Sequence, residues 1–324
     1  MSLQNLSVMG CDGTNVNTGR KGGVIRLLAT YVGRLLKWDI CMLHDNELPL
    51  RHLILEMDGC TKGPYSYSGA IGLLLKDCEK TPVVKFDQID CTLQPLDLKD
   101  IKKLSTDQQY LYRICLAIKD GSYSSSVTGN SPGKLSHARW LTTANRLLRL
   151  YIGTPSPSQN LIILVKYVTL VYAPMWFEIK MKSNCPYGAQ HFWKMISLAM
   201  QLPDNVKQII YKVFSNNAYF AHPEHLLLTM LHDSRKHIRE LAVRCILAAR
   251  DKKTNNSGGL RFNKLPKLNF EAADYTDLID WSNCVVTEPP LTMHIKGQRF
   301  ERNVQRRTVS STNFRGISMS HAIC

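Results

Sequence analysis

The stretch that most constrains the fold lies at residues 7–50, where four short patterns follow one another. A short apolar run ends at Cys11-Asp12 and leads into the turn GTNVNTGRKGG, whose glycines let the backbone bend sharply. Apolar residues then recur at three- and four-residue steps over 24–36, which predicts a helix. Residues 40–43 form a second apolar run, predicted as a strand. The first sixty or so residues therefore have α/β character.

The rest of the sequence has mostly helical patterns. Clusters of turn-forming residues separate the helical segments at 59–69, 120–133 and 251–259. Helices are predicted at residues 48–57, 70–78, 105–119, 136–152, 159–172, 189–202, 204–216, 223–231 and 235–250.

Two of these helices have start signals. Ser105 is followed three residues later by Gln108, which is the spacing of a capping box. Ser158 can cap the helix that begins at residue 159. The most apolar run, 161–177, is interrupted by Lys166 and Pro174, so we expect no membrane span there.

The charge balance predicts a polyanionic partner. The chain has 41 Lys and Arg against 26 Asp and Glu, a formal net charge of +15. A field of this sign attracts phosphate backbones, so DNA is the expected partner, and a basic protein without a nucleic-acid role is the alternative. From residue 296 onward six basic residues accompany one acid, Glu301, which is typical of a disordered basic tail.

The cysteines and the first residues indicate the compartment. Ten cysteines are scattered without a C-x-x-C pair, and residues 1–5 lack the basic and apolar regions of a signal peptide. We therefore predict an intracellular, nuclear protein with reduced thiols. We expect neither a membrane nor a small-molecule substrate as a partner, and self-association stays open.

Three motifs in order carry a resemblance to a known family. CDGTNVNTGRKGG is followed by CMLHDNEL and later by SHARWLTT. Together they resemble the second-aspartate region, the C-x-x-H element and the Arg-Trp element of hAT-superfamily DNA transposases. The resemblance covers roughly the first half of the chain. Within the superfamily, the chain resembles transposon-derived arthropod proteins through the motifs GCDGTNVNTGRKGG, LSH-x-RWLTTANR, NAYFAHPE and TEPP.

The resemblance implies a partial RNase H-like core with a large, mostly α-helical insertion and C-terminal part. The expected regions are 1–120 (partial core), 134–250 (insertion and remainder of the core), 260–295 (C-terminal segment) and 296–324 (tail). Few residues precede the first strand, so we expect a piece of a longer protein or a reading frame truncated at its N-terminus.

The implied chemistry is metal-dependent cleavage and transfer of DNA strands. In such enzymes two aspartates and a glutamate hold two Mg²⁺ ions, because hard cations prefer oxygen ligands. Asp12 matches the second aspartate and would be a catalytic metal ligand; the alternative is a local Asx turn. No acid precedes Asp12, so the first aspartate is missing from this sequence. The third acid is Glu240 or Glu288, and Glu240 has an alternative as an ion-pair partner of Lys236 or Arg244.

The remaining candidates are structural or contact DNA. Cys41 and His44 match the C-x-x-H element, structural in the family; a zinc half-site would need two more ligands, and a buried thiol with a hydrogen-bonded imidazole is the simpler alternative. Arg20, Lys21, Arg139 and Trp140 are the expected DNA contacts. Trp140 can stack on a flipped base, and core packing is its alternative.

Overall fold

The chain forms two compact units of different character. The computed structural model describes residues 3, 6, 8–19, 22–60, 67–122, 131–135, 140–183, 185–251 and 265–284, without the side chains of 249–251 and 283. Unit 1 groups Met1–Asp45, Lys182–Lys194 and Ser215–Cys324, and unit 2 groups Asn46–Met181 and Met195–Phe214. Each unit therefore collects separate stretches of sequence, whereas the ranges expected from the sequence are contiguous.

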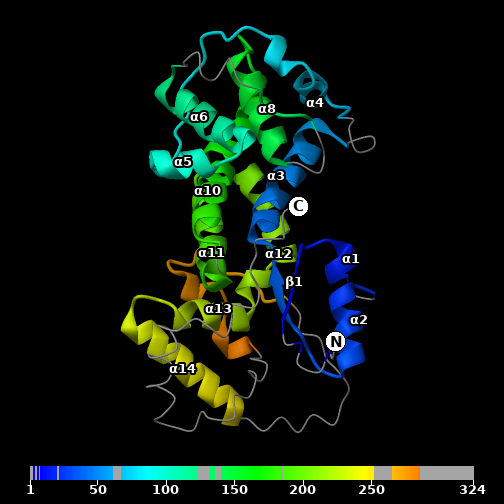
Figure 1. Cartoon of the computed structure of the whole chain (residues 1–324), viewed down its shortest axis with the longest axis vertical. Coiled ribbons are helices and arrows are strands. Elements are labelled where there is room, and N and C mark those ends of the chain that lie inside the picture. Colours follow the sequence, from blue (N-terminus) through cyan, green and yellow to red (C-terminus); the bar gives the residue numbers. More distant parts are fainter. Residues whose placement is uncertain are drawn as a thin grey trace. The chain divides into compact units, whose positions relative to one another are not determined.

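Unit 1 contains a small parallel sheet. Strand β1 (Val8–Cys11) pairs with β2 (Lys37–Ile40), with Gly10 opposite Asp39. Helices α1 (Asn15–Thr18) and α2 (Val24–Val32) connect the two strands, because parallel neighbours need a crossover (Figure 1). The expected α/β character of the N-terminal region is confirmed. The strand prediction at 40–43 is wrong beyond Ile40, since a helix already begins at Met42.

The rest of unit 1 is helical and irregular. Helix α13 (Pro223–Leu231) packs on α14 (Lys236–Asp251), and both come within one residue of their predicted bounds. The turn between them is fixed by Asp233, which accepts hydrogen bonds from the Arg235 side chain and from the Tyr275 hydroxyl at 2.6 Å. Short 3-10 turns complete the described part: η4 (Cys185–Tyr187), η5 (Tyr219–Ala221), η6 (Tyr275–Asp277) and η7 (Trp281–Asn283).

Unit 2 is built from helices, with no strand among its described residues. Three helices have residues in both units, because a unit boundary falls within each of them. They are α3 (Met42–Asp58), α11 (Gly188–Ala199) and α12 (Asp204–Asn216). The remaining elements are α4 (Ala70–Leu75), η2 (Cys78–Lys80), α5 (Leu98–Lys103), α6 (Thr106–Asp120), α8 (Trp140–Ile152), α9 (Gln159–Tyr167), η3 (Val168–Tyr172) and α10 (Ala173–Met181).

The two start signals read from the sequence are confirmed. At α6 the Ser105 N–H donates to Oε1 of Gln108 at 3.1 Å, as a capping box requires. At α9 the Ser158 hydroxyl accepts from the Leu161 N–H. Helix α6 ends at Gly121, whose φ of 64° lies in the left-handed region that glycine adopts without strain.

The expected break at Pro174 is wrong. Helices α9 and α10 join through the π-helical stretch η3 into one run, Gln159–Met181. By length and composition this 23-residue run could cross a membrane, but 78% of its most apolar window is buried inside the structure. The core helix of a soluble protein passes the same test, so the run is weak evidence for a membrane span.

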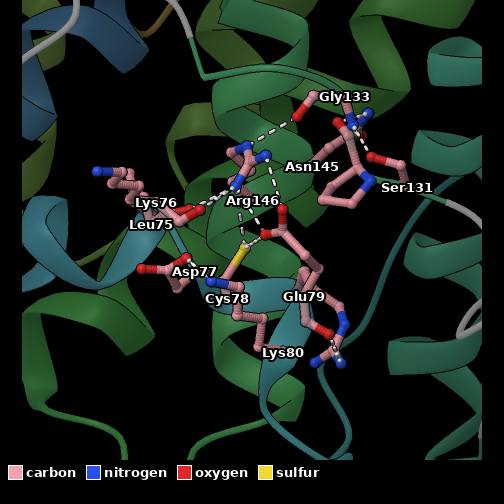
Figure 2. A network of polar contacts seen from close by, with 12 residues as sticks. Leu75, Lys76, Asp77, Cys78, Glu79, Lys80, Ser131, Gly133, Asn145 and Arg146 are labelled. Atoms are coloured by element: carbon pink, nitrogen blue, oxygen red, sulfur yellow. Dashed lines mark hydrogen bonds and ion pairs between the residues drawn. The ribbon is translucent and has the colours of Figure 1, made fainter.

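The buried Arg146 of α8 binds the chain at the end of α4 and in η2. Arg146 is 5% exposed and donates to the carbonyls of Leu75 at 2.6 Å and Gly133 at 2.8 Å (Figure 2). It also forms a two-pronged ion pair with Glu79, at 2.8 and 3.2 Å. The Cys78 sulfur lies 3.7 Å from the same guanidinium. One side chain thus fixes the path of η2 and of the loop that precedes α8.

Candidate functional site

The Asp12 turn follows directly from β1. The Thr14 N–H and hydroxyl donate to Oδ1 of Asp12 at 3.1 and 2.7 Å, and the Asn17 amide donates to the same oxygen at 2.7 Å. Burial raises the pKa of Asp12, but these hydrogen bonds and the neighbouring His44 outweigh it and hold the pKa below its ordinary value. Asp12 is therefore an ionised local acceptor, as its Asx-turn interpretation predicts.

The structure brings His44 to this turn. His44 lies in the first turn of α3, at the end of the C-x-x-H element. A Cβ placed on Gly13 would lie 3.1 Å from Cδ2 of His44, tighter than an ordinary contact. Glycine at position 13 therefore lets the imidazole approach the Asp12 turn. Two predicted site elements more than thirty positions apart in sequence are adjacent in space.

Cys41 holds the two strand ends together through its backbone. The Cys41 N–H donates to the Cys11 carbonyl at 2.9 Å, which extends the parallel pairing by one bond.

Burial first, and then the charges of Asp12 and Asp39, raise the pKa of the Cys11 thiol to about 11. Cys11 is thus a neutral thiol near neutral pH.

The buried carboxylate of Asp39 on β2 was not predicted from the sequence. Asp39 is 6% exposed, and its Oδ1 atom has no hydrogen-bond partner among the described residues. Burial, the Asp39 charge and a hydrogen bond to Asp39 raise the pKa of the Cys185 thiol. His225, whose pKa is lowered by burial, is close enough for the Asp39 charge to oppose that shift. The available signal was weak: Asp39 directly precedes the apolar run 40–43.

A second missed carboxylate lies one residue after His44. Asp45 is 2% exposed, and neither of its carboxylate oxygens has a hydrogen-bond partner among the described residues. Burial raises its pKa well above the ordinary value, so the group favours its neutral form. Burial first, and then the nearby Asp45 and Cys11, raise the pKa of Tyr219, so Asp45 and Tyr219 lie near each other in unit 1.

The other predicted site residues are not brought to this turn by any described contact. Glu240 forms an ion pair with Lys236 at 3.4 Å on the exposed face of α14. This agrees with its interpretation as an ion-pair partner rather than as the third catalytic acid. Trp140 opens α8 in unit 2 and is half-buried. Arg20, Lys21, Arg139 and Glu288 lie outside the described residues, as does the predicted tail 296–324.

The described residues do not form the acid set that Mg²⁺ would need. A search of the described side chains finds no group of three or more His, Cys, Asp or Glu placed to hold a metal ion. Asp12 directs one oxygen to Thr14 and Asn17, and Asp39 is hydrogen-bonded to Cys185. Binding of Mg²⁺ stays a prediction.

Comparison with known proteins gives no relative: no protein-family model, no curated protein and no solved structure matches the chain.

Proposed function

We propose that this protein is a DNA-binding protein derived from a hAT-type transposase and that its acid set is incomplete. The ancestral activity is metal-dependent cleavage and transfer of DNA strands. In this chain the expected role is to bind DNA in the nucleus without cutting it. A non-enzymatic module that binds proteins or DNA, domesticated from a transposase, is the alternative.

One observation carries the proposal. The Asp12 turn and His44 belong to two separate motifs of the resemblance, and they meet at Gly13 beside the ends of two parallel strands. The carboxyl end of a parallel strand is a usual place for a catalytic carboxylate in α/β folds. The helical unit 2 also interrupts unit 1 in sequence, although it begins at Asn46, well before the insertion expected at 134–250. The RNase H-like assignment of the core rests on these features together.

The case against catalysis rests on the ligands. Two-metal catalysis requires several carboxylates to hold two cations a few ångströms apart. Among the described side chains no group of three or more His, Cys, Asp or Glu is placed to hold a metal ion, and Glu240 is engaged with Lys236. Purified protein with supercoiled plasmid and Mn²⁺ should leave the plasmid supercoiled. Nicking that is lost in Asp12→Ala would show that another acid completes the site, and it would refute the proposal that the acid set is incomplete.

DNA binding is tested through its dependence on salt. Binding of a fluorescent duplex, followed by anisotropy, should weaken by orders of magnitude between about 50 and about 200 mM salt, because bound phosphates release counterions. Residues 296–324 carry six basic residues and one acid, +5 of the chain's +15, so a chain ending at Ile295 should bind more weakly and with a smaller salt slope.

A matched control separates the charge of this segment from its length. A full-length variant with Arg302, Arg306 and Arg307 replaced by Gln keeps the chain length and loses three positive charges. It should reproduce part of the loss in affinity and in slope. Affinity that does not change with salt would refute the DNA-binding proposal and leave the protein-binding alternative.

A further inference from the structure

An extended segment of unit 2 runs antiparallel along helix α6. The Ile89 N–H donates to the Ile118 carbonyl at 3.4 Å, near the end of α6. Further along the segment, the Leu96 N–H donates to the Tyr112 hydroxyl at 3.1 Å, near the middle of the helix. These two hydrogen bonds fix the register of the segment against the helix.

The register turns Cys91 towards the helix. Ile89, Cys91 and Leu93 are 7%, 3% and 7% exposed, while Asp90 and Thr92 between them are exposed, the two-residue period of an extended chain. Two extended residues advance about 6–7 Å, which equals about four residues of helix. The position opposite Cys91 therefore lies three to four residues before Ile118. The fully buried Cys115 lies there, and its side chain is hydrogen-bonded to Cys91.

The two thiols differ in acidity, although they are in contact. A hydrogen bond from Cys115 lowers the pKa of Cys91, with help from the Leu93 N–H and the charge of Lys119, against the opposing effect of burial. Burial first, and then its contact with Cys91, raise the pKa of Cys115 well above the ordinary value. Cys91 is thus the better nucleophile, and Cys115 holds the proton.

We propose that Cys91 and Cys115 form a dithiol site that hydrogen peroxide converts into an intramolecular disulfide. The Cys91 thiolate attacks one peroxide oxygen, the O–O bond breaks, and the departing hydroxide takes a proton to become water. The Cys115 sulfur then attacks the sulfenic acid of Cys91, and the S–OH bond breaks. The hydroxyl leaves as a second water with the proton of Cys115. Two thiols lose two electrons, and one peroxide gains them.

The disulfide ties the extended segment to α6. It closes a loop over residues 91–115, which contains α5 and the capped start of α6. Closing such a loop restricts the unfolded chain, so the oxidised protein should melt at a higher temperature than the reduced protein. The site is independent of the proposed function, since no step of it involves DNA or Asp12.

Peptide mapping tests the pairing directly. The reduced protein is treated with hydrogen peroxide, free thiols are alkylated, and trypsin is added without a reductant. Cleavage after Lys85, Lys99, Arg113 and Lys119 places Cys91 in peptide 86–99 and Cys115 in peptide 114–119. The two peptides should appear linked, at their summed mass less about 2 Da for the two hydrogens lost. Dithiothreitol should separate them and reverse the rise in melting temperature.

Two variants complete the experiment. Cys91→Ala removes the nucleophile and should abolish both the linked peptide and the rise in melting temperature. Cys60→Ser changes an exposed thiol outside the pair and should leave both effects intact. Recovery of both peptides as separate alkylated or over-oxidised species would overturn the proposal. A link from either cysteine to a different thiol would overturn it as well.

Discussion

The buried Arg146 offers the sharpest test of how unit 2 is held together. Arg146→Leu keeps an apolar side chain of moderate volume in α8 and removes all the hydrogen bonds of the guanidinium. The carbonyls of Leu75 and Gly133 lose their side-chain donor, and Glu79 loses its ion-pair partner. A buried polar group left unpaired costs about 1–3 kcal/mol.

The expected loss of stability follows from these contacts. The Glu79 side chain is 38% exposed and can be solvated when its partner is gone, so the carbonyls dominate the cost. We expect Arg146→Leu to destabilise the protein by about 3–5 kcal/mol, within the range for a broken buried pair. Glu79→Gln keeps an acceptor and removes only the charge, so its expected cost is about 1 kcal/mol.

Two measurements check the reasoning, one global and one local. Urea unfolding followed by circular dichroism gives the change in stability. The alkylation rate of Cys78, a 1% exposed thiol beside Arg146, reports local opening of this segment and should rise in Arg146→Leu. Lys76→Ala, at an exposed position nearby, should change neither. A cost below about 1 kcal/mol in Arg146→Leu, with unchanged Cys78 reactivity, would show that water replaces the guanidinium without loss.

Two further predictions concern unit 1. Burial raises the pKa of Asp233, but hydrogen bonds from Arg235 and Tyr275 outweigh it and hold the pKa at about 2. Since this folded-state pKa lies below the unfolded value, its stabilisation of about 2 kcal/mol is present above pH 4 and is lost as pH falls towards 2. Asp233→Asn should therefore differ most from the wild type in melts at neutral pH, and an equal difference at pH 2 would contradict this assignment. Asp12→Ala should cost about 1 kcal/mol by removing the acceptor for Thr14 and Asn17, whereas Asp12→Asn keeps Oδ1 and should cost less. Equal thermal melts for all three proteins would show that the Asp12 turn does not stabilise the fold.

Local signals were sufficient where one segment determined its own structure. Helix α12 matches its predicted bounds because Asp204 starts a segment of good helix formers with one apolar face. The capping box of α6 was also readable, since both partners lie within one turn. Strand β1 corresponds to the short apolar run before Asp12, and helix α2 was predicted from periodicity. Helix α2 ends at Val32, earlier than the pattern indicated, because Gly33 with φ of 73° follows it.

The site was predictable only in part, because much of it depends on tertiary contacts. Asp12 was found through its glycine-rich turn, but no pattern in sequence indicates that Asp39, Cys185 and His225 lie close together. These three residues come from β2, η4 and α13, and their proximity is set by how those elements pack. The start of α3 was also missed: the helix predicted at 48–57 begins at Met42, and Pro49 lies inside it.

Pro174 shows how the chain accommodates a residue that usually ends a helix. Proline lacks an N–H, so in a regular α-helix the carbonyl four residues earlier loses its donor. Immediately before Pro174 the hydrogen bonds change register, and the Ala173 N–H donates to the Val168 carbonyl, five residues back. With this change of register the helical run continues to Met181. Val168, Tyr172 and Trp176 are buried, so packing of this face stabilises the continuous helix despite the lost hydrogen bond. A rule that considers only local backbone chemistry predicts a break here, and burial along the whole run decides against it.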